Sequence, residues 1–235
     1  MSCVVYTCHN VVPLPAGREE RGTVDLKSFL HQLCWLKRLG VRFIPLSDLR
    51  VWLEGKKDIP KRAAVLTFDD ALISIAEHVF SYLEQQSIPI TIFIIAGLIG
   101  RESNFSSRPA APRRCHLDFG QIKRLLNTGL VEIGAHGYHH IDFTRIDGDQ
   151  LRQELHEAKS LLEKSFGVEV PYLSYPWGNT TEFVSQLAKE AGYRLAFTTR
   201  KKKLVSTNVD RFRLPRVSWG RRATFFKLYK YFLIP

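Results

Sequence analysis

The sequence lacks several features that mark particular classes of protein. It has four cysteines, and no two of them form a Cys-x-x-Cys pair, which argues against a thiolate zinc site. Four cysteines in 235 residues are also too few for a disulfide framework. No run approaches the roughly 20 apolar residues of a membrane-spanning helix. The first residues have neither the basic nor the apolar region of a signal peptide. We therefore expect a cytoplasmic protein.

Acidic residues are outnumbered: Lys plus Arg is 34 and Asp plus Glu is 23, giving a formal charge of +11. The positive charges gather in short runs, which we interpret as solvated loops and helix ends. No basic surface interleaved with aromatic residues is predicted, so we expect no nucleic acid as a partner. Residues 221–235 mix basic and aromatic side chains. They predict a terminal helix docked on the fold, with contact to an anionic membrane as the alternative.

Short apolar runs alternate with helical patterns, which predicts one α/β domain over residues 1–235. A barrel is favoured, and an open doubly wound sheet is the alternative. The predicted strands lie at residues 3–7, 41–44, 63–68, 90–95, 131–135, 172–175, 194–198 and 213–217. The predicted helices lie at residues 25–38 and 74–86, after a capping box at Asp118 and Gln121, from Asp147 to Phe166, and from Asn179 to Gly192. Between strands and helices, the irregular segment 97–115 has the length of a functional or mobile loop.

Two aspartates follow the third predicted strand, in the order Thr67-Phe68-Asp69-Asp70. Adjacent carboxylates take separate roles when a metal binds one of them and leaves the other to accept a proton from water. A helix cap is the alternative explanation for an aspartate at this place. The position itself favours chemistry, because catalytic groups of a barrel lie at the carboxyl ends of its strands.

Three histidines follow another predicted strand, and His136 and His140 are four residues apart. Imidazoles at that spacing in a turn can face one ion from the same side, whereas His139 is expected to point elsewhere. Two histidines and one carboxylate leave positions open for water and substrate. Non-heme iron oxygenases use the same donor set, but the spare aspartate favours hydrolysis.

These segments resemble the polysaccharide deacetylase family, also called the NodB-homology family. Residues 67–70 match its Thr-Phe-Asp-Asp motif, residues 136–140 match its His-x-x-x-His motif, and Pro176-Trp177-Gly178 and Leu214-Pro215-Arg216 resemble two weaker motifs. The resemblance implies a distorted (β/α)₇ barrel. It also implies that Asp70, His136 and His140 hold zinc, or cobalt, nickel, manganese or iron, and that Asp69 is the base.

The resemblance further implies how the substrate is held. The backbone N–H of Trp177 would stabilise the oxyanion, and Tyr175, Pro176 and Trp177 would contact the substrate. In one circularly permuted subgroup the acid histidine is near the N-terminus, which makes His9 the candidate general acid here. Ala71 and Ser174 depart from the family pattern, where a glycine and an arginine that pairs with the base are usual.

The predicted function is metal-dependent removal of acetyl groups from N-acetylated sugars in a polysaccharide or glycan precursor. Hydrolysis of a small non-sugar amide on the same scaffold is one alternative, because a fold does not determine its substrate. The other is a glycan-binding module without activity, which the departure at Ser174 and the open identity of the general acid keep as an alternative.

Overall fold

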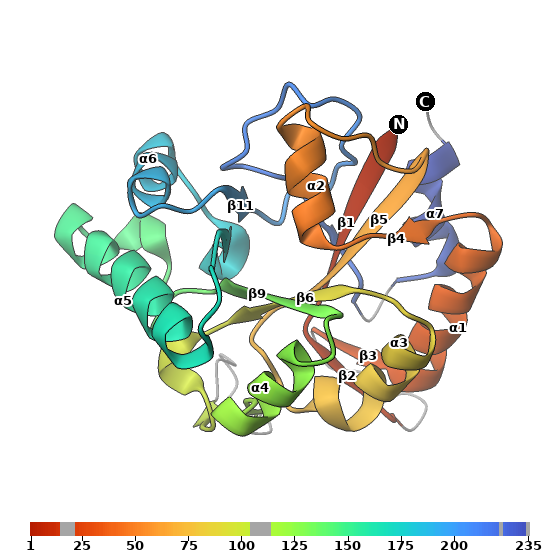
Figure 1. Cartoon of the computed structure of the whole chain (residues 1–235), viewed down its shortest axis with the longest axis horizontal. Helices are drawn as coiled ribbons and strands as arrows, with labels where there is room; N and C mark the ends of the chain where they lie inside the picture. The colour runs from red at the N-terminus through yellow and green to blue at the C-terminus, as the bar shows by residue number, and fades with distance from the viewer. Residues whose placement is uncertain (15–21, 104–113, 221–222, 234–235) are drawn as a thin grey trace.

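Eight parallel strands form the main sheet of the protein. The computed structural model describes residues 1–14, 22–103, 114–220 and 223–233. Seven strands follow one another in the order β11-β10-β9-β6-β5-β1-β12, and β4 pairs only with the first half of β5 (Figure 1). Their bounds are β1 Ser2–Cys8, β4 Arg42–Phe43, β5 Arg62–Phe68, β6 Ile90–Ile94, β9 Val131–Ala135, β10 Tyr172–Ser174, β11 Leu195–Phe197 and β12 Val217–Ser218.

The two ends of this sheet approach each other through one short segment. Val217 in β12 pairs with Tyr6 in β1, and Leu214, three residues earlier, forms a parallel bridge with Phe197 in β11. A single bridge closes the ring on that side, so the barrel is incomplete there. The predicted distorted (β/α)₇ barrel in a single domain is confirmed, and the open doubly wound sheet is excluded.

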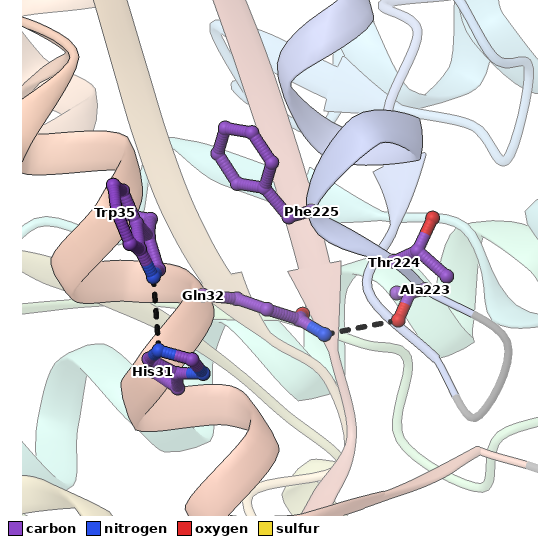
Figure 2. A pocket seen from close by; sticks show the side chains of 6 residues that line it. All are labelled: His31, Gln32, Trp35, Ala223, Thr224 and Phe225. Atoms are coloured by element: carbon purple, nitrogen blue, oxygen red, sulfur yellow. Dashed lines mark hydrogen bonds between the residues drawn. The ribbon is translucent and has the colours of Figure 1, made fainter.

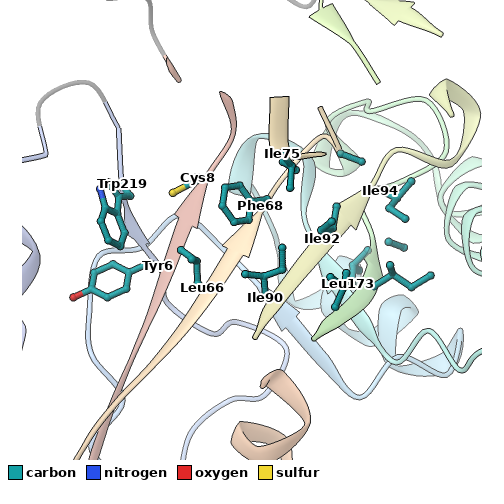
Figure 3. Close-up of a cluster of buried hydrophobic side chains, with 14 of the residues drawn as sticks. Tyr6, Cys8, Leu66, Phe68, Ile75, Ile90, Ile92, Ile94, Leu173 and Trp219 are labelled. Atoms are coloured by element: carbon teal, nitrogen blue, oxygen red, sulfur yellow. The ribbon is translucent and has the colours of Figure 1, made fainter. Parts of the chain in front are cut away.

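Alternate residues of each strand enter two different cores, as the two-residue period of a strand requires. The outer core lies between the strands and the helices and includes Val4, Tyr6, Ala64 and Leu66. Figure 3 shows part of this core along the strands. The inner core fills the barrel; it includes Cys3, Val5, Ala63 and Val65. The next inward positions are Thr67 on β5 and Asp69 directly after it, so the inner face changes from apolar to polar towards the carboxyl ends of the strands.

Helices surround the barrel (Figure 1). Their bounds are α1 Leu26–Arg38, α2 Leu46–Leu53, α3 Phe80–Gln85 after a π-helical turn at Ile75–Val79, α4 Phe119–Leu126, α5 Gly148–Phe166, α6 Glu182–Glu190 and α7 Phe225–Leu233. The capping box at Asp118 and the left-handed end at Gly167 are confirmed. The predicted start of α6 at Asn179 is wrong: Thr181 caps the helix, because its side chain accepts from the Val184 N–H while Asn179 bonds to Asp142.

One short helix and two small ladders were not predicted. Helix α2 places Leu46, Leu49 and Trp52 in the inner core, and it therefore covers the end of the barrel opposite the polar groups. Two small ladders join β2 (Asn10–Val12) to β3 (Thr23–Asp25) and β7 (Glu102–Ser103) to β8 (Arg114–Cys115). The second ladder holds both ends of the predicted long loop together, and residues 104–113 lie outside the described part.

Helix α7 packs on α1 and on the first strand. The hydroxyl of Tyr6 donates to the carbonyl of Leu228 at 2.8 Å, and Gln32 on α1 donates to the carbonyl of Ala223 at 3.0 Å (Figure 2). The described part of the predicted terminal helix is therefore docked; its residues 221–222 and 234–235 lie outside the description. Among the described helices, none is long and apolar enough to span a bilayer.

Candidate active site

Asp69 and Asp70 diverge because the backbone turns sharply between them. Asp69 continues the inward alternation of β5, and its N–H donates to the Cys8 carbonyl at 2.9 Å. Asp70 has a φ of 70°, a left-handed conformation that sends its carboxylate in another direction. His116 supports this turn, since its Nδ1 lies 2.7 Å from the Asp70 carbonyl oxygen. Neighbouring carboxylates thus face two different environments, which is the condition for separate roles.

The predicted metal ligands converge on one point. Nε2 of His136 and Nε2 of His140 lie 3.6 and 3.7 Å from Oδ1 of Asp70. Within the described residues this is the one group of three such donors, and the donor atoms all lie within 4.8 Å of one another. His136 is oriented by its Nδ1, which lies 2.7 Å from the carbonyl oxygen of Ser174. Such a bond fixes the ring so that Nε2 faces the site.

The geometry and the chemistry of these donors fit a divalent ion. Ligands about 2.1 Å from a tetrahedral ion lie about 3.4 Å from each other, close to the separations seen here. The buried Oδ1 of Asp70 has no hydrogen-bond partner among the described residues, and an ion would satisfy it. Burial, followed by the nearby His136, lowers the pKa of His140 to about 3. Its imidazole is therefore neutral at pH 7, which is the form that binds a metal.

Asp69 is held by a buried arginine. Nη1 and Nη2 of Arg216 donate to Oδ1 and Oδ2 of Asp69, both at 2.7 Å. The hydroxyl of Ser174 lies between the two groups: it accepts from Arg216 at 2.7 Å and donates to Asp69 at 3.2 Å. The rings of Phe93 and Phe197 lie against the guanidinium. Arg216 thus gives Asp69 an arginine partner, which the family resemblance led us to expect at the position of Ser174.

The ion pair determines the protonation state of Asp69. Burial by itself raises the pKa of the carboxyl, but the charge of Arg216, then that of His136, and the hydrogen bonds from Arg216 hold the pKa below its ordinary value. Asp69 is therefore ionised at neutral pH. A carboxylate has about four lone-pair sites, so it can still accept a proton beside these bonds.

The partner of Asp69 was missed at the sequence level, although Arg216 lies in a segment that the resemblance singled out. The sequence did contain a signal for this partner. In the predicted strand 213–217, Arg216 comes two residues after Leu214, so both side chains lie on the same face. Ala71 stands where the family usually has a glycine. Its φ is 54°, a conformation that costs alanine about 1 kcal/mol relative to glycine. The substitution is therefore at a strained position and not in ordinary backbone.

The Pro-Trp-Gly turn forms one wall beside the histidines. Trp177 has a φ of 62°, its side chain is 54% exposed, and its ring lies 5.2 Å from that of His140. Tyr175 and Pro176 are buried, and the Tyr175 hydroxyl donates to the Phe212 carbonyl at 2.9 Å. Of these three residues, Trp177 alone presents a largely exposed side chain at this wall.

His9 lies between β1 and β2, at the same end of the barrel. After the larger effects of burial and of other charged groups, a positive charge on His9 would also lower the pKa of Asp69 and of His140. It is therefore within electrostatic range of both. His139, in contrast, turns away and bonds to Glu154, as the sequence predicted.

A curled parallel barrel with an Asp-His-His donor set and an ionised aspartate beside it defines a class of metal-dependent hydrolases. A family model for polysaccharide deacetylase matches residues 56–196, and the chain belongs to this family.

Known proteins of the same class are similar over most of the chain. The poly-beta-1,6-N-acetyl-D-glucosamine N-deacetylase of Staphylococcus aureus is 26% identical over 203 residues, which cover 83% of this chain and 67% of that protein. The fold is that of IcaB from Ammonifex degensii (TM-score 0.83, 24% identity, 99% and 97% of the two chains). It is also that of the Streptococcus pyogenes deacetylase PplD solved with acetate (TM-score 0.85, 20% identity, 100% and 99%).

Proposed function

We propose that the protein removes acetyl groups from the N-acetylated sugars of a glycan by metal-dependent hydrolysis. The observation that carries the proposal is the convergence of Asp70, His136 and His140 beside Asp69, which is kept ionised by Arg216. A glycan containing N-acetylglucosamine is the proposed substrate, because the Staphylococcus aureus relative is named for a polymer of that sugar. Release of acetate from such a glycan tests the proposal.

In this proposal each site residue has a defined task. Asp70, His136 and His140 hold a divalent ion, with zinc as the first choice, which supplies Lewis acidity towards the acetyl oxygen and the attacking water. Asp69 accepts a proton from that water. The backbone N–H of Trp177 donates to the oxyanion, and the exposed indole ring of Trp177 provides a flat surface for a sugar. His9 donates a proton to the departing amine.

The assignment of His9 as acid predicts a dependence on the leaving group. Replacing His9 with alanine should lower kcat for an N-acetylated sugar by about 10²-fold or more, because an amine leaves only when protonated. The same variant should hydrolyse p-nitrophenyl acetate almost as fast as wild type, since that leaving group needs no acid. Acetate and nitrophenol assays on one preparation measure both. An equal loss on the two substrates would rule out this role.

Contact of α7 with an anionic lipid surface is a separate proposal. It is supported by Phe226, which is 76% exposed, and by the neighbouring Lys227 and Lys230. Sedimentation with phosphatidylglycerol vesicles, but not with phosphatidylcholine vesicles, is the expected result; equal sedimentation with both would contradict it.

A further inference from the structure

A buried carboxylate outside the donor set contacts the loop that carries two of the three donors. Glu154 lies in the second turn of α5, and its side chain is 6% exposed. Its Oε2 accepts from the backbone N–H of Tyr138 at 2.9 Å and from that of His139 at 3.1 Å. Its Oε1 accepts from Nδ1 of His139. All three of these partners lie between His136 and His140.

The opposite side of the same loop is also fixed. The N–H groups of Ala96 and Gly97 donate to the carbonyls of Gly137 and Tyr138, at 3.1 and 2.9 Å. A Cβ on Gly97 would lie 2.7 Å from the Tyr138 carbonyl oxygen, so the two backbones are closer than a residue with a side chain allows. The loop is therefore held on two sides. The turn at Ala96–Leu98 binds its carbonyls, and Glu154 on α5 binds its amides.

Of the three donors, His140 is the one that directly follows the loop held by Glu154. Asp70 is supported by His116 through its own carbonyl, and His136 follows directly from β9 and bonds to Ser174. His140 stands at the end of the loop with a φ of 63°, a left-handed conformation that is unfavourable for a residue with a side chain. A backbone held in such a conformation needs support from its surroundings.

We propose that Glu154 is a positioning residue for the candidate metal site, which holds the loop 137–139 so that His140 faces Asp70 and His136. The inference rests on the proposed metal site but goes beyond the donor set. The carboxylate acts through the two backbone amides, and the bond to the side chain of His139 is secondary. His139 itself is 63% exposed and makes no contribution to the donor set.

Cobalt(II) titration followed by visible absorption tests this proposal, because both affinity and band shape report on the donor geometry. For Glu154→Ala we expect the Kd to rise about 10- to 100-fold and the absorption bands to change. Glu154→Gln and His139→Ala should stay close to wild type, since both keep an oxygen that accepts from the two amides. Glu157→Ala is the matched control on the same helix, where Glu157 bonds to Gln153 on the surface.

The outcomes separate this inference from the proposed function. If wild type binds cobalt and Glu154→Ala binds it with the same affinity and spectrum, Glu154 has no positioning role and the metal site stands. If wild type binds no cobalt, the metal site and this inference both fail. Should Glu154→Ala not fold, Glu154→Asp takes its place: the shorter side chain withdraws from the amides, so weaker binding supports the inference and unchanged binding overturns it.

Discussion

Replacing Asp69 with asparagine is expected to lower kcat for acetate release by about 10²- to 10⁴-fold while the metal content stays that of wild type. Asparagine is nearly the same size but cannot accept a proton from water at neutral pH. The donors Asp70, His136 and His140 are untouched, because Asp69 bonds to Arg216 and Ser174 and is not among them. Acetate release and elemental analysis of the same sample measure the two quantities.

The substitution also leaves the buried Arg216 without its anion, so stability needs its own control. Urea unfolding of the variant shows whether it is stable enough to stay folded at the assay temperature. Asp149→Asn on the exposed first turn of α5 provides a matched change of charge away from the site. Acetate release close to wild type in a folded, metal-containing Asp69→Asn protein would remove Asp69 from the role of base.

The second large effect concerns Arg216. Replacing it with methionine should lower the free energy of unfolding by about 3–5 kcal/mol at pH 7, because a buried carboxylate then lacks its partner. The double variant Asp69→Asn/Arg216→Met should recover much of this loss, since it removes both charges. Urea unfolding of the two single variants and the double variant, all without metal, gives the comparison.

This loss should depend on pH in a definite direction. In wild type the pKa of Asp69 lies below its ordinary value of about 3.9. Its ion pair therefore stabilises the protein above that value, and the contribution disappears as the pH falls through the folded pKa. In Arg216→Met, burial raises the pKa of Asp69, and protonation then relieves the buried charge. The deficit of the variant should be largest near pH 7 and smaller near pH 4; an equal deficit at both would contradict the ion-pair account.

The sequence predicted the barrel and the donor set because both depend on local patterns. Apolar runs of strand length defined most of the sheet, and parallel strands place their carboxyl ends at one edge. Asp70 and His136 each follow such a run, so their proximity could be expected. Helix α2 was missed although Leu46, Leu49, Trp52 and Leu53 have helical spacing, because no side chain caps its start; α4 has the same length but begins with a capping box.

Contacts between segments far apart in the chain could not be predicted from the sequence. Asp69 and Arg216 are separated by 147 positions, and nothing local indicates that the segment at 214–218 closes the barrel beside β1. The contact of Glu154 with the loop of His140 is of the same kind, because it depends on how α5 lies on the barrel. The left-handed φ of Ala71 has no signal in alanine itself; only the glycine that is usual at this position in the family pointed to it.

Acetate release from an N-acetylglucosamine oligosaccharide, measured on protein stripped of metal and then reloaded, tests whether the site of Asp70, His136 and His140 supports metal-dependent deacetylation. We expect no release after stripping, recovery with about one equivalent of zinc or cobalt, and no recovery for Asp70→Ala or His136→Ala, which should not retain the ion. If metal-loaded wild type binds the glycan without releasing acetate, a binding module without activity is the better account. If it cleaves small non-sugar amides instead, the proposed substrate is wrong.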